Sequence, residues 1–279
     1  MLPDWVILAA LAGLGSNALN FFSRVILKKE GDSTSWAWFF ETFRLFCFIT
    51  LAFFDYRLVI NLQSLNLLFW LGITEFISVY LYMKMHKYSE LSISSIASRS
   101  RVIWIPIIAF LFFGEHLTTL EYLGIVILFL GLSVAISPKR FFIDKGVIYA
   151  NLAAIVIAIN TVLLKEAIPY ASYSVIMIFY CLPSALLFPI FMKGAFKRIK
   201  SSIKINLHFK VLASMANITA TYLLLMALSR GDVSRVNAVY QSMMIFAVLA
   251  GIILLKEKGG IVRKILGSVI TIAGVLLLT

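Results

Sequence analysis

Long runs of apolar residues, each about twenty residues in length, alternate with short polar connections along the whole chain. A helix needs about 20 apolar residues to cross a hydrocarbon core, whereas strands of a membrane barrel show about 10 residues of alternating character. Because the runs are continuous, they predict membrane-spanning helices. We expect ten spans, at residues 4–27, 34–55, 64–84, 91–113, 119–137, 144–164, 171–192, 207–228, 233–255 and 261–278.

The composition supports an all-α integral membrane protein. Of the 279 residues, 61% are hydrophobic and only 14% are charged, whereas about a quarter of a soluble domain is charged. The connections between the spans are short, so nothing is left over for a soluble domain. Cys47 and Cys181 both fall inside apolar runs, where we expect them to act as small buried hydrophobic side chains.

The net charge of +12 indicates membrane topology and not nucleic-acid binding, because the basic residues lie between apolar runs. With ten spans, the loops that follow odd-numbered spans lie opposite the termini. That side carries seventeen basic residues, and the terminus side carries four: Arg57, Lys165, Arg230 and Arg235. Since cytoplasmic loops are enriched in Lys and Arg, we expect a multi-pass protein of the cell (inner, cytoplasmic) membrane with both termini non-cytoplasmic.

An internal repeat divides the chain into residues 1–140 and 141–279. Residues 80–115 and 222–257 match at an offset of 142, and the matches include polar residues as well as apolar ones. At an offset of 143, Gly124 matches Gly267 and Gly131 matches Gly274. Because a repeat of five spans is odd, the second half must insert upside down. This predicts two inverted five-helix repeats, an architecture of secondary transporters.

Residues 88–132 resemble the end of an EamA-type repeat. They combine a small-residue start to the fourth span, a proline within it (Pro106), a Gly-Glu pair at its end, and then the Gly124–Gly131 spacing. The pattern recurs at 222–278, except that Val248 replaces Pro106 and Lys256 replaces Gly114. The chain is identified as a member of the drug/metabolite transporter superfamily, ten-helix branch. The resemblance implies transport of small metabolites, often amino acids or related compounds, by ion coupling or exchange.

Ionisable side chains inside the spans are the first candidate functional residues, because a charge near the bilayer centre costs about 2.5–3.5 kcal/mol on insertion scales. Glu75 lies near the middle of the third span, and Arg99 and Arg101 lie in the fourth. Glu41 and Arg44 lie three residues apart in the second span, where they either form an intrahelical ion pair or place Arg44 in a cavity with Glu41 in support. These three arginines against two glutamates favour a substrate that carries a carboxylate or a phosphate.

The repeat helps to choose among these groups, since Glu75 matches Asn217 and Arg99 matches Gln241. A position that is polar in both halves is expected to face the shared interior. Arg101 lies about 200° around an ideal helix from Arg99, so we expect Arg99 to face the cavity and Arg101 to pair with a neighbouring helix or snorkel. Glu75 is either a permanent salt-bridge partner of one of these arginines or a carboxylate that exchanges a proton as substrate binds.

Further candidates for substrate binding are amides and tyrosines at positions that the repeat or the spans single out: Asn17, Asn20, Asn160, Asn217, Tyr80, Tyr222, Tyr240 and Gln241. Glu41 and Arg101 are candidates for coupling or support. Glu115 and Glu257 end the fourth and ninth spans, where we expect packing and gating roles. The histidines lie at span ends without metal-ligand spacing, and we expect no metal, cofactor or catalytic residue.

The sequence therefore favours a secondary active transporter, an exporter or an exchanger, that moves a small metabolite such as an amino acid or an organic anion. Protons or a counter-substrate would drive it, and a monomer is sufficient. Organic cations or drugs, and nucleotide-linked or lipid-linked sugars, are alternative cargoes. A membrane receptor or scaffold is the alternative outside transport, and an intramembrane enzyme is disfavoured because the spans lack catalytic motifs.

Overall fold

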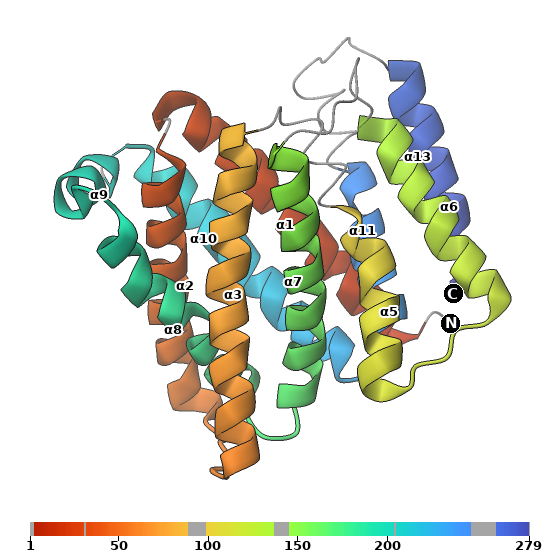
Figure 1. The fold of residues 1–279 in the computed structure, drawn as a ribbon, viewed down its shortest axis with the longest axis horizontal. Coiled ribbons are helices and arrows are strands. Elements are labelled where there is room, and N and C mark those ends of the chain that lie inside the picture. The colour runs from red at the N-terminus through yellow and green to blue at the C-terminus, as the bar shows by residue number, and fades with distance from the viewer. Residues whose placement is uncertain are drawn as a thin grey trace.

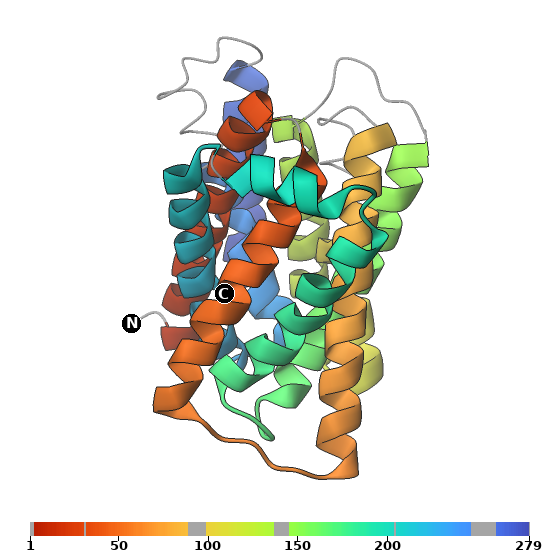
Figure 2. The same cartoon turned by 90° about the vertical axis from the view of Figure 1, so that its left-hand side faces the viewer.

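The computed structural model describes residues 3–30, 32–88, 99–136, 145–203, 205–246 and 261–278. Within these ranges the chain folds almost entirely into helices (Figures 1 and 2). The helices are α1 (Asp4–Glu30), α2 (Ser33–Asp55), α3 (Leu62–Tyr88), α5 (Arg101–Phe113), α6 (Thr119–Ile136), α7 (Lys145–Ala167), α8 (Tyr173–Phe191), α9 (Ala195–Ile203), α10 (Leu207–Leu228), α11 (Val233–Ser242) and α13 (Ile261–Leu276).

Five of the described helices are long and apolar enough to cross a membrane: α2, the Leu62–Tyr82 part of α3, α7, α8 and α10. Shorter apolar stretches occur in α1, α5 and α6. The predicted all-helical class is confirmed over the described ranges, and the number of ten spans stays a prediction. Parts of the fourth and ninth predicted spans, 91–98 and 247–255, lie outside the described residues.

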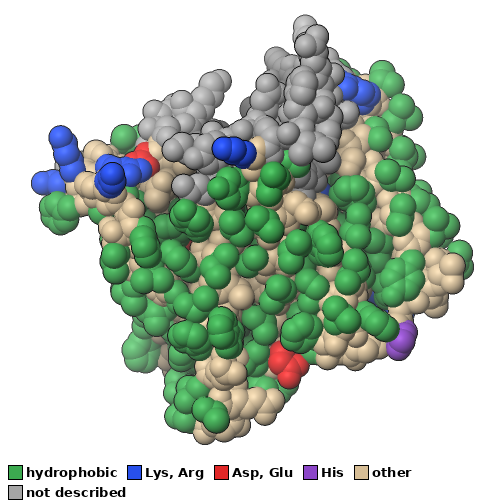
Figure 3. Space-filling view, viewed as in Figure 1, with side chains coloured by type: hydrophobic (Ala, Val, Ile, Leu, Met, Phe, Trp, Pro, Cys, Tyr) green, Lys and Arg blue, Asp and Glu red, His purple; other side chains and the backbone are tan. Residues whose placement is uncertain are grey.

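The outer surface of the bundle is apolar, as a lipid-facing surface must be. Hydrophobic side chains cover most of the face shown in Figure 3. Large side chains such as Phe54 and Leu111 are exposed to 86% and 71%. Contiguous exposed apolar surface of this kind indicates contact with a membrane, which makes the chain a multi-pass membrane protein.

The contacts between helices repeat when the two halves are exchanged. The exchange takes α1, α2, α3, α5 and α6 to α7, α8, α10, α11 and α13. It turns the contact of α1 with α10 into that of α7 with α3, and the contact of α5 with α7 into that of α11 with α1. The pairs α2–α8, α5–α11 and α6–α13 each map onto themselves. This pattern indicates a pseudo-twofold axis between the halves, as an inverted repeat requires.

Glycines bring α6 and α13 into close contact. A Cβ atom on Gly131 would lie 2.5 Å from the backbone nitrogen of Thr271, and one on Gly274 would lie 2.6 Å from that of Leu128. A Cβ atom on Gly124 would lie 2.8 Å from the carbonyl oxygen of Gly274. The matching glycines of the two halves therefore let α6 and α13 pack closely, and this contact joins the fifth position of each half.

The connection between α8 and α10 is basic and contains the short helix α9. Arg198 donates two hydrogen bonds to Asp32, the N-cap of α2, at 2.8 and 2.6 Å. The two residues hold α9 across one end of the bundle, the upper end in Figure 2. The apolar-run criterion missed this helix because it is only nine residues long and amphipathic.

Backbone hydrogen bonds join two connections at the opposite end of the bundle. The amide of Val59 donates to the carbonyl oxygen of Tyr170 at 2.7 Å, and that of Ser172 donates to Arg57 at 2.8 Å. The Arg57 guanidinium also donates to the carbonyl oxygen of Ile168 at 2.7 Å. We call this the joined end; it is the lower end in Figure 2, and its hydrogen bonds fix α2 and α3 relative to α7 and α8.

Candidate functional site

The first group of buried polar side chains lies on α2, α3, α7 and α8; we call it the carboxylate cluster, and it contains Glu41, Arg44, Glu75, Asn160 and Tyr180. Glu41 and Arg44 are both buried, and the guanidinium Nη1 lies 3.0 Å from the carboxylate Oε1. The Arg44 guanidinium also lies 5.5 Å from the centre of the Tyr180 ring. Of the two arrangements open for the first pair, the structure has the intrahelical ion pair, which offsets the cost of burying either charge alone.

Glu75 is held by neutral groups. Its Oε2 accepts hydrogen bonds from Asn160 Nδ2 at 2.9 Å and from Ser78 Oγ at 2.8 Å. Asn160 in turn accepts a hydrogen bond from Thr74 at 3.3 Å. Among the described residues Glu75 forms no salt bridge, so the alternative of a permanent pair with Arg99 or Arg101 is not realised.

The second group lies where the start of α5 meets α11; we call it the arginine cluster. Arg99 Nη1 and Arg101 Nη2 both donate to Gln241 Oε1, each at 2.8 Å. Gln241 also donates to Asn237 Oδ1 at 3.3 Å. One neutral amide oxygen thus accepts from two guanidinium groups, which places two positive charges side by side.

The expectation that Arg99 and Arg101 point to different sides is wrong. The separation of about 200° holds only inside a regular helix. Here α5 begins at Arg101, and Ser100 is its N-cap residue. Arg99 is itself helical, but the turn at Ser100 separates it from α5, and the two long side chains reach the same acceptor from either side of this turn.

Arg101 has no carboxylate partner among the described residues. Its interactions with charged or ionisable groups are with Tyr240, Tyr82 and Tyr180. Its Nε atom is buried and makes no hydrogen bond. A buried cation without a counter-ion is costly, so this position is suited to receive an anion.

Tyr180 lies between the two clusters, since it interacts with Arg44 and Glu75 on one side and with Arg101 on the other. Sequence reasoning missed it, because nothing marks this residue among the eleven tyrosines of the chain. Asn151 of α7 also belongs to this region, although it was not among the candidates. It accepts hydrogen bonds from Ser100 at 2.8 Å and from Trp104 at 3.1 Å and so orients the start of α5.

The space beside the arginine cluster is contracted. A cleft of about 10 Å³ is lined by Asn17 of α1, Arg99, Arg101, Tyr240 and Gln241. That volume holds about one water molecule, so the described residues must separate before a metabolite can bind. The Asn17 side chain donates to the carbonyl oxygen of Gly13 at 2.8 Å, within the same helix.

Residues related by the repeat meet at this site. Arg99 and Gln241, which match at an offset of 142, are directly hydrogen-bonded to each other. Asn160 of α7 corresponds to Asn17 of α1 at an offset of 143, and each packs against the span that carries Glu75 or its counterpart Asn217. The pseudo-twofold axis therefore passes through the polar interior, while the carboxylate is present in one half only.

The remaining candidates lie away from these clusters. Tyr80 is 45% exposed on α3. Asn217 is half-buried and accepts a hydrogen bond from Thr221 within α10. The Tyr222 hydroxyl donates to Asp55 at 3.2 Å near the joined end. Asn20 belongs to α1, and its side chain lies outside the described residues.

Glu115 ties three helices together near the joined end. Its carboxylate accepts from the backbone nitrogens of Val233 at 2.8 Å and Ser234 at 3.2 Å, which are the first residues of α11. It also lies 3.3 Å from Lys165 Nζ, at the end of α7. A carboxylate at a helix N-terminus is stabilised by the helix dipole, so Glu115 joins α5, α7 and α11. Glu257, its counterpart in the repeat, lies outside the described residues.

An apolar helical bundle whose two halves exchange contacts around buried charged side chains has the architecture of a membrane transporter. Comparison with known proteins specifies the class further. The chain belongs to the EamA-like transporter family, of the drug/metabolite transporter superfamily, whose sequence model matches residues 4–137 and again 144–279. Membership implies a membrane transporter of small molecules and not an enzyme.

The solved structures agree with this fold. One crystal structure of a protein is 13% identical to the chain, covers 100% of it and 97% of its own length, and superposes with a TM-score of 0.74. At that identity the likeness concerns the fold alone. No curated protein sequence matches the chain. In the described residues no group of three or more His, Cys, Asp or Glu side chains could hold a metal ion.

Proposed function

We propose that the chain is a secondary active transporter of a small anionic metabolite, such as an amino acid or an organic anion. The substrate carboxylate or phosphate would bind between Arg99 and Arg101, on the axis that relates the two halves. Alternating access would then follow from rocking of the first four spans of one half against those of the other.

The observation that carries this proposal is the convergence of Arg99 and Arg101 on the single amide oxygen of Gln241. A glutamine oxygen carries no net charge, so it does not neutralise Arg101, which has no carboxylate partner among the described residues. A planar guanidinium can hold a carboxylate or a phosphate through two parallel hydrogen bonds. An arriving anion would replace Gln241 as acceptor and supply a negative charge beside Arg101.

Glu75 is our candidate for coupling to protons. It lies in the neighbouring carboxylate cluster, where Asn160 and Ser78 donate to it and Arg44 lies within electrostatic range. Because no salt bridge holds it in place, it can change its protonation state without breaking an ion pair. We propose that it takes up or releases a proton as substrate enters and leaves.

We further propose that the chain lies in the cytoplasmic membrane with both termini outside and α9 on the cytosolic face, where its Lys197, Arg198 and Lys200 satisfy the positive-inside rule. A cysteine in place of Lys200, in a chain without Cys47 and Cys181, tests this orientation. A membrane-impermeant maleimide added to intact cells should leave it unlabelled. Labelling without permeabilisation would reverse the orientation.

Ligand-induced thermal stabilisation of the purified protein tests the substrate class. The panel contains amino acids, organic anions, organic cations and sugar phosphates. We expect carboxylates or phosphates to raise the Tm of the wild-type protein, and Arg99→Gln and Arg101→Gln each to abolish this rise while the ligand-free variants stay folded. Arg230→Gln removes an arginine at an exposed helix end and should keep the full response.

Stabilisation by organic cations alone would overturn the anion proposal. If Glu75→Gln then abolished that stabilisation, the carboxylate and not the arginine pair would hold the cargo. The chain would in that case resemble a drug exporter in its site chemistry.

A further inference from the structure

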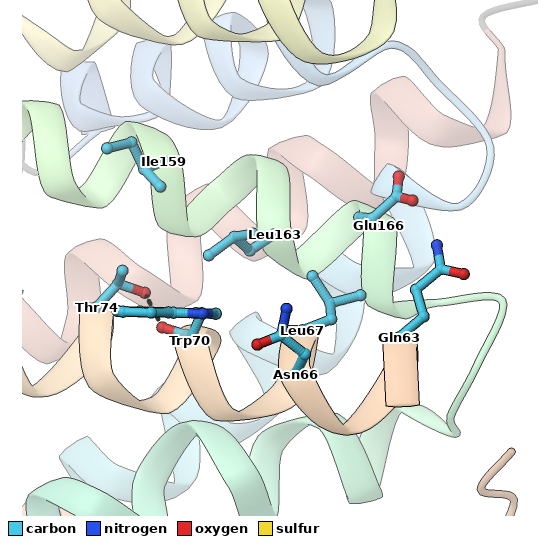
Figure 4. Close-up of a pocket in the computed structure, with 8 residues that line it drawn as sticks. All are labelled: Gln63, Asn66, Leu67, Trp70, Thr74, Ile159, Leu163 and Glu166. Carbon is cyan, nitrogen blue, oxygen red and sulfur yellow. Dashed lines mark hydrogen bonds between the residues drawn. The ribbon is translucent and has the colours of Figure 1, made fainter. Parts of the chain in front are cut away.

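A groove of about 330 Å³ lies between α3 and α7, apart from both polar clusters. Figure 4 shows its residues along the two helices: Gln63 and Glu166 lie at one end, Trp70 and Leu163 in the middle, and Thr74 at the other end. The groove opens on the outer face of the bundle, since Trp70 is 51% exposed. Its volume lies within the range of small-molecule sites.

Polar side chains mark one end of this groove. Gln63 and Asn66 come from the first turn or so of α3, and Glu166 from the last turn of α7. None of the three forms a hydrogen bond or ion pair within the described chain. Both helix ends adjoin the hydrogen-bonded connections of the joined end, which places this mouth at the boundary of the membrane.

The rest of the groove is apolar. Leu67, Trp70, Ile159 and Leu163 line it from the mouth inward. A polar mouth at the membrane boundary above an apolar channel open to lipid matches the two parts of a phospholipid, its headgroup and its acyl chain. The bilayer supplies phospholipid at far higher concentration than any solute.

The polar side chains at the mouth of the groove determine which lipid headgroup fits there. A carboxylate accepts hydrogen bonds and carries negative charge, and the two amides offer further acceptors. A primary ammonium donates three hydrogen bonds, whereas a quaternary ammonium donates none. We propose that the groove binds a phospholipid with a primary ammonium headgroup, whose nitrogen pairs with Glu166 beside Gln63 and whose acyl chain lies along Leu67, Trp70 and Leu163.

The inner end of the groove reaches the carboxylate cluster through one side chain. Thr74 lines the groove and donates to Asn160 at 3.3 Å, and Asn160 donates to Glu75 at 2.9 Å. A bound acyl chain therefore contacts a residue that helps to orient the polar interior. Lipid in this groove would stabilise the arrangement of α3 and α7 that the structure shows.

Quenching of Trp70 fluorescence by brominated lipids tests the proposal without any transport step. The full-length protein is reconstituted in vesicles with chain-brominated phosphatidylethanolamine or the matched phosphatidylcholine, and the Trp70 signal is taken as the difference from Trp70→Phe. We expect the ethanolamine lipid to reach half-quenching at about two- to fivefold lower fraction, the selectivity of one partly exposed ion pair. Glu166→Gln should make the two lipids equal.

Asp4→Asn is the matched control, because it removes a carboxylate from an exposed helix end outside the groove, and it should keep the selectivity. Leu163→Phe, with its larger ring in the groove, should weaken quenching of Trp70 by both lipids. Equal quenching by the two lipids in the wild-type protein would overturn the proposal, and so would a selectivity that survives Glu166→Gln.

Discussion

At the scale of single residues, a change at Glu75 should affect proton coupling without affecting substrate binding. Its counterpart in the repeat, Asn217, carries no charge, so one half alone supplies a proton-binding group. Glu75→Gln keeps the hydrogen bond from Asn160 through its amide oxygen and removes the titration. We expect this variant to exchange substrate across the membrane but to lose accumulation driven by a pH gradient. Undiminished uphill transport by the variant would exclude Glu75 as the coupling group.

Asp32 links stability to pH at the start of α2. Although partial burial opposes it, hydrogen bonds from Arg198 and Ser35 lower the pKa of Asp32 from 3.8 to about 2. The folded state therefore gains stability that is complete above the unfolded pKa and is lost as pH falls through the folded one. We expect Asp32→Ala to reduce the free energy of unfolding by about 0.5–2 kcal/mol at neutral pH, as for other N-caps.

The pH dependence of this loss identifies its cause. In thermal unfolding of the detergent-solubilised protein, the difference between the wild type and Asp32→Ala should shrink as the pH drops from 4 towards 2. Lys197→Ala lies on α9 beside Arg198 but outside the ion pair, so this variant should be as stable as the wild type over the same pH range. If the stability difference between the wild type and Asp32→Ala stays constant down to the lowest pH, packing and not the ionised Asp32 side chain supplies the stability.

The candidate site could be predicted from the sequence only in part. The charged residues Glu41, Glu75 and Arg99 stand out because ionisable residues are rare in apolar runs. Tyr180 does not, because a tyrosine in a span is as consistent with packing as with function. The expected orientation of Arg101 was wrong because periodicity alone does not reveal that a turn at Ser100 interrupts the helix between the two arginines.

At the scale of helices, the glycine contact between α6 and α13 ties the ends of the two halves together. A side chain at Gly131 would meet the backbone and the hydroxyl of Thr271. We expect Gly131→Val to cost about 1–3 kcal/mol through overpacking and to lower the Tm in detergent. Leu130→Val on the same turn alters an exposed position and should have little effect; equal destabilisation by both would refute the close contact.

Helix positions were predictable because a run of about twenty apolar residues has few alternatives in a membrane. The structure accordingly begins α2, α7 and α10 within a residue of the expected positions. The helix α9 was missed because its nine residues mix charge and apolar side chains. The bridge between the connections at 56–61 and 168–172 depends on tertiary contacts that no local pattern encodes.

At the scale of the whole molecule, the repeat predicts more than the number of halves. Residues that match in the repeat should make matching contacts. The contact between α1 and α10 does correspond to the contact between α7 and α3. The repeat does not reveal which conformation the molecule adopts. The cleft at the arginine cluster is contracted and the joined end is held by several hydrogen bonds, so access from that end requires these bonds to break.

Glu115 is the residue whose loss should open the joined end. It holds the start of α11 through Val233 and Ser234 and the end of α7 through Lys165. Glu115→Gln removes the charge from these hydrogen bonds, and charge-assisted bonds contribute about 1.5–3 kcal/mol each. A loss of only 1.4 kcal/mol would raise the open population about tenfold.

A cysteine at Ser16, which lines the cleft, reports this opening in a chain without Cys47 and Cys181. An impermeant thiol reagent added from the side of the joined end should modify it about tenfold faster in Glu115→Gln. Asp4→Asn is the matched control, since it removes an exposed carboxylate whose ion pair with Arg230 is long, at 3.8 Å. Because the two variants remove the same charge from the same side, a faster reaction in Glu115→Gln alone would assign the closure to the contacts of Glu115. Equal rates in all three proteins would place the closure elsewhere.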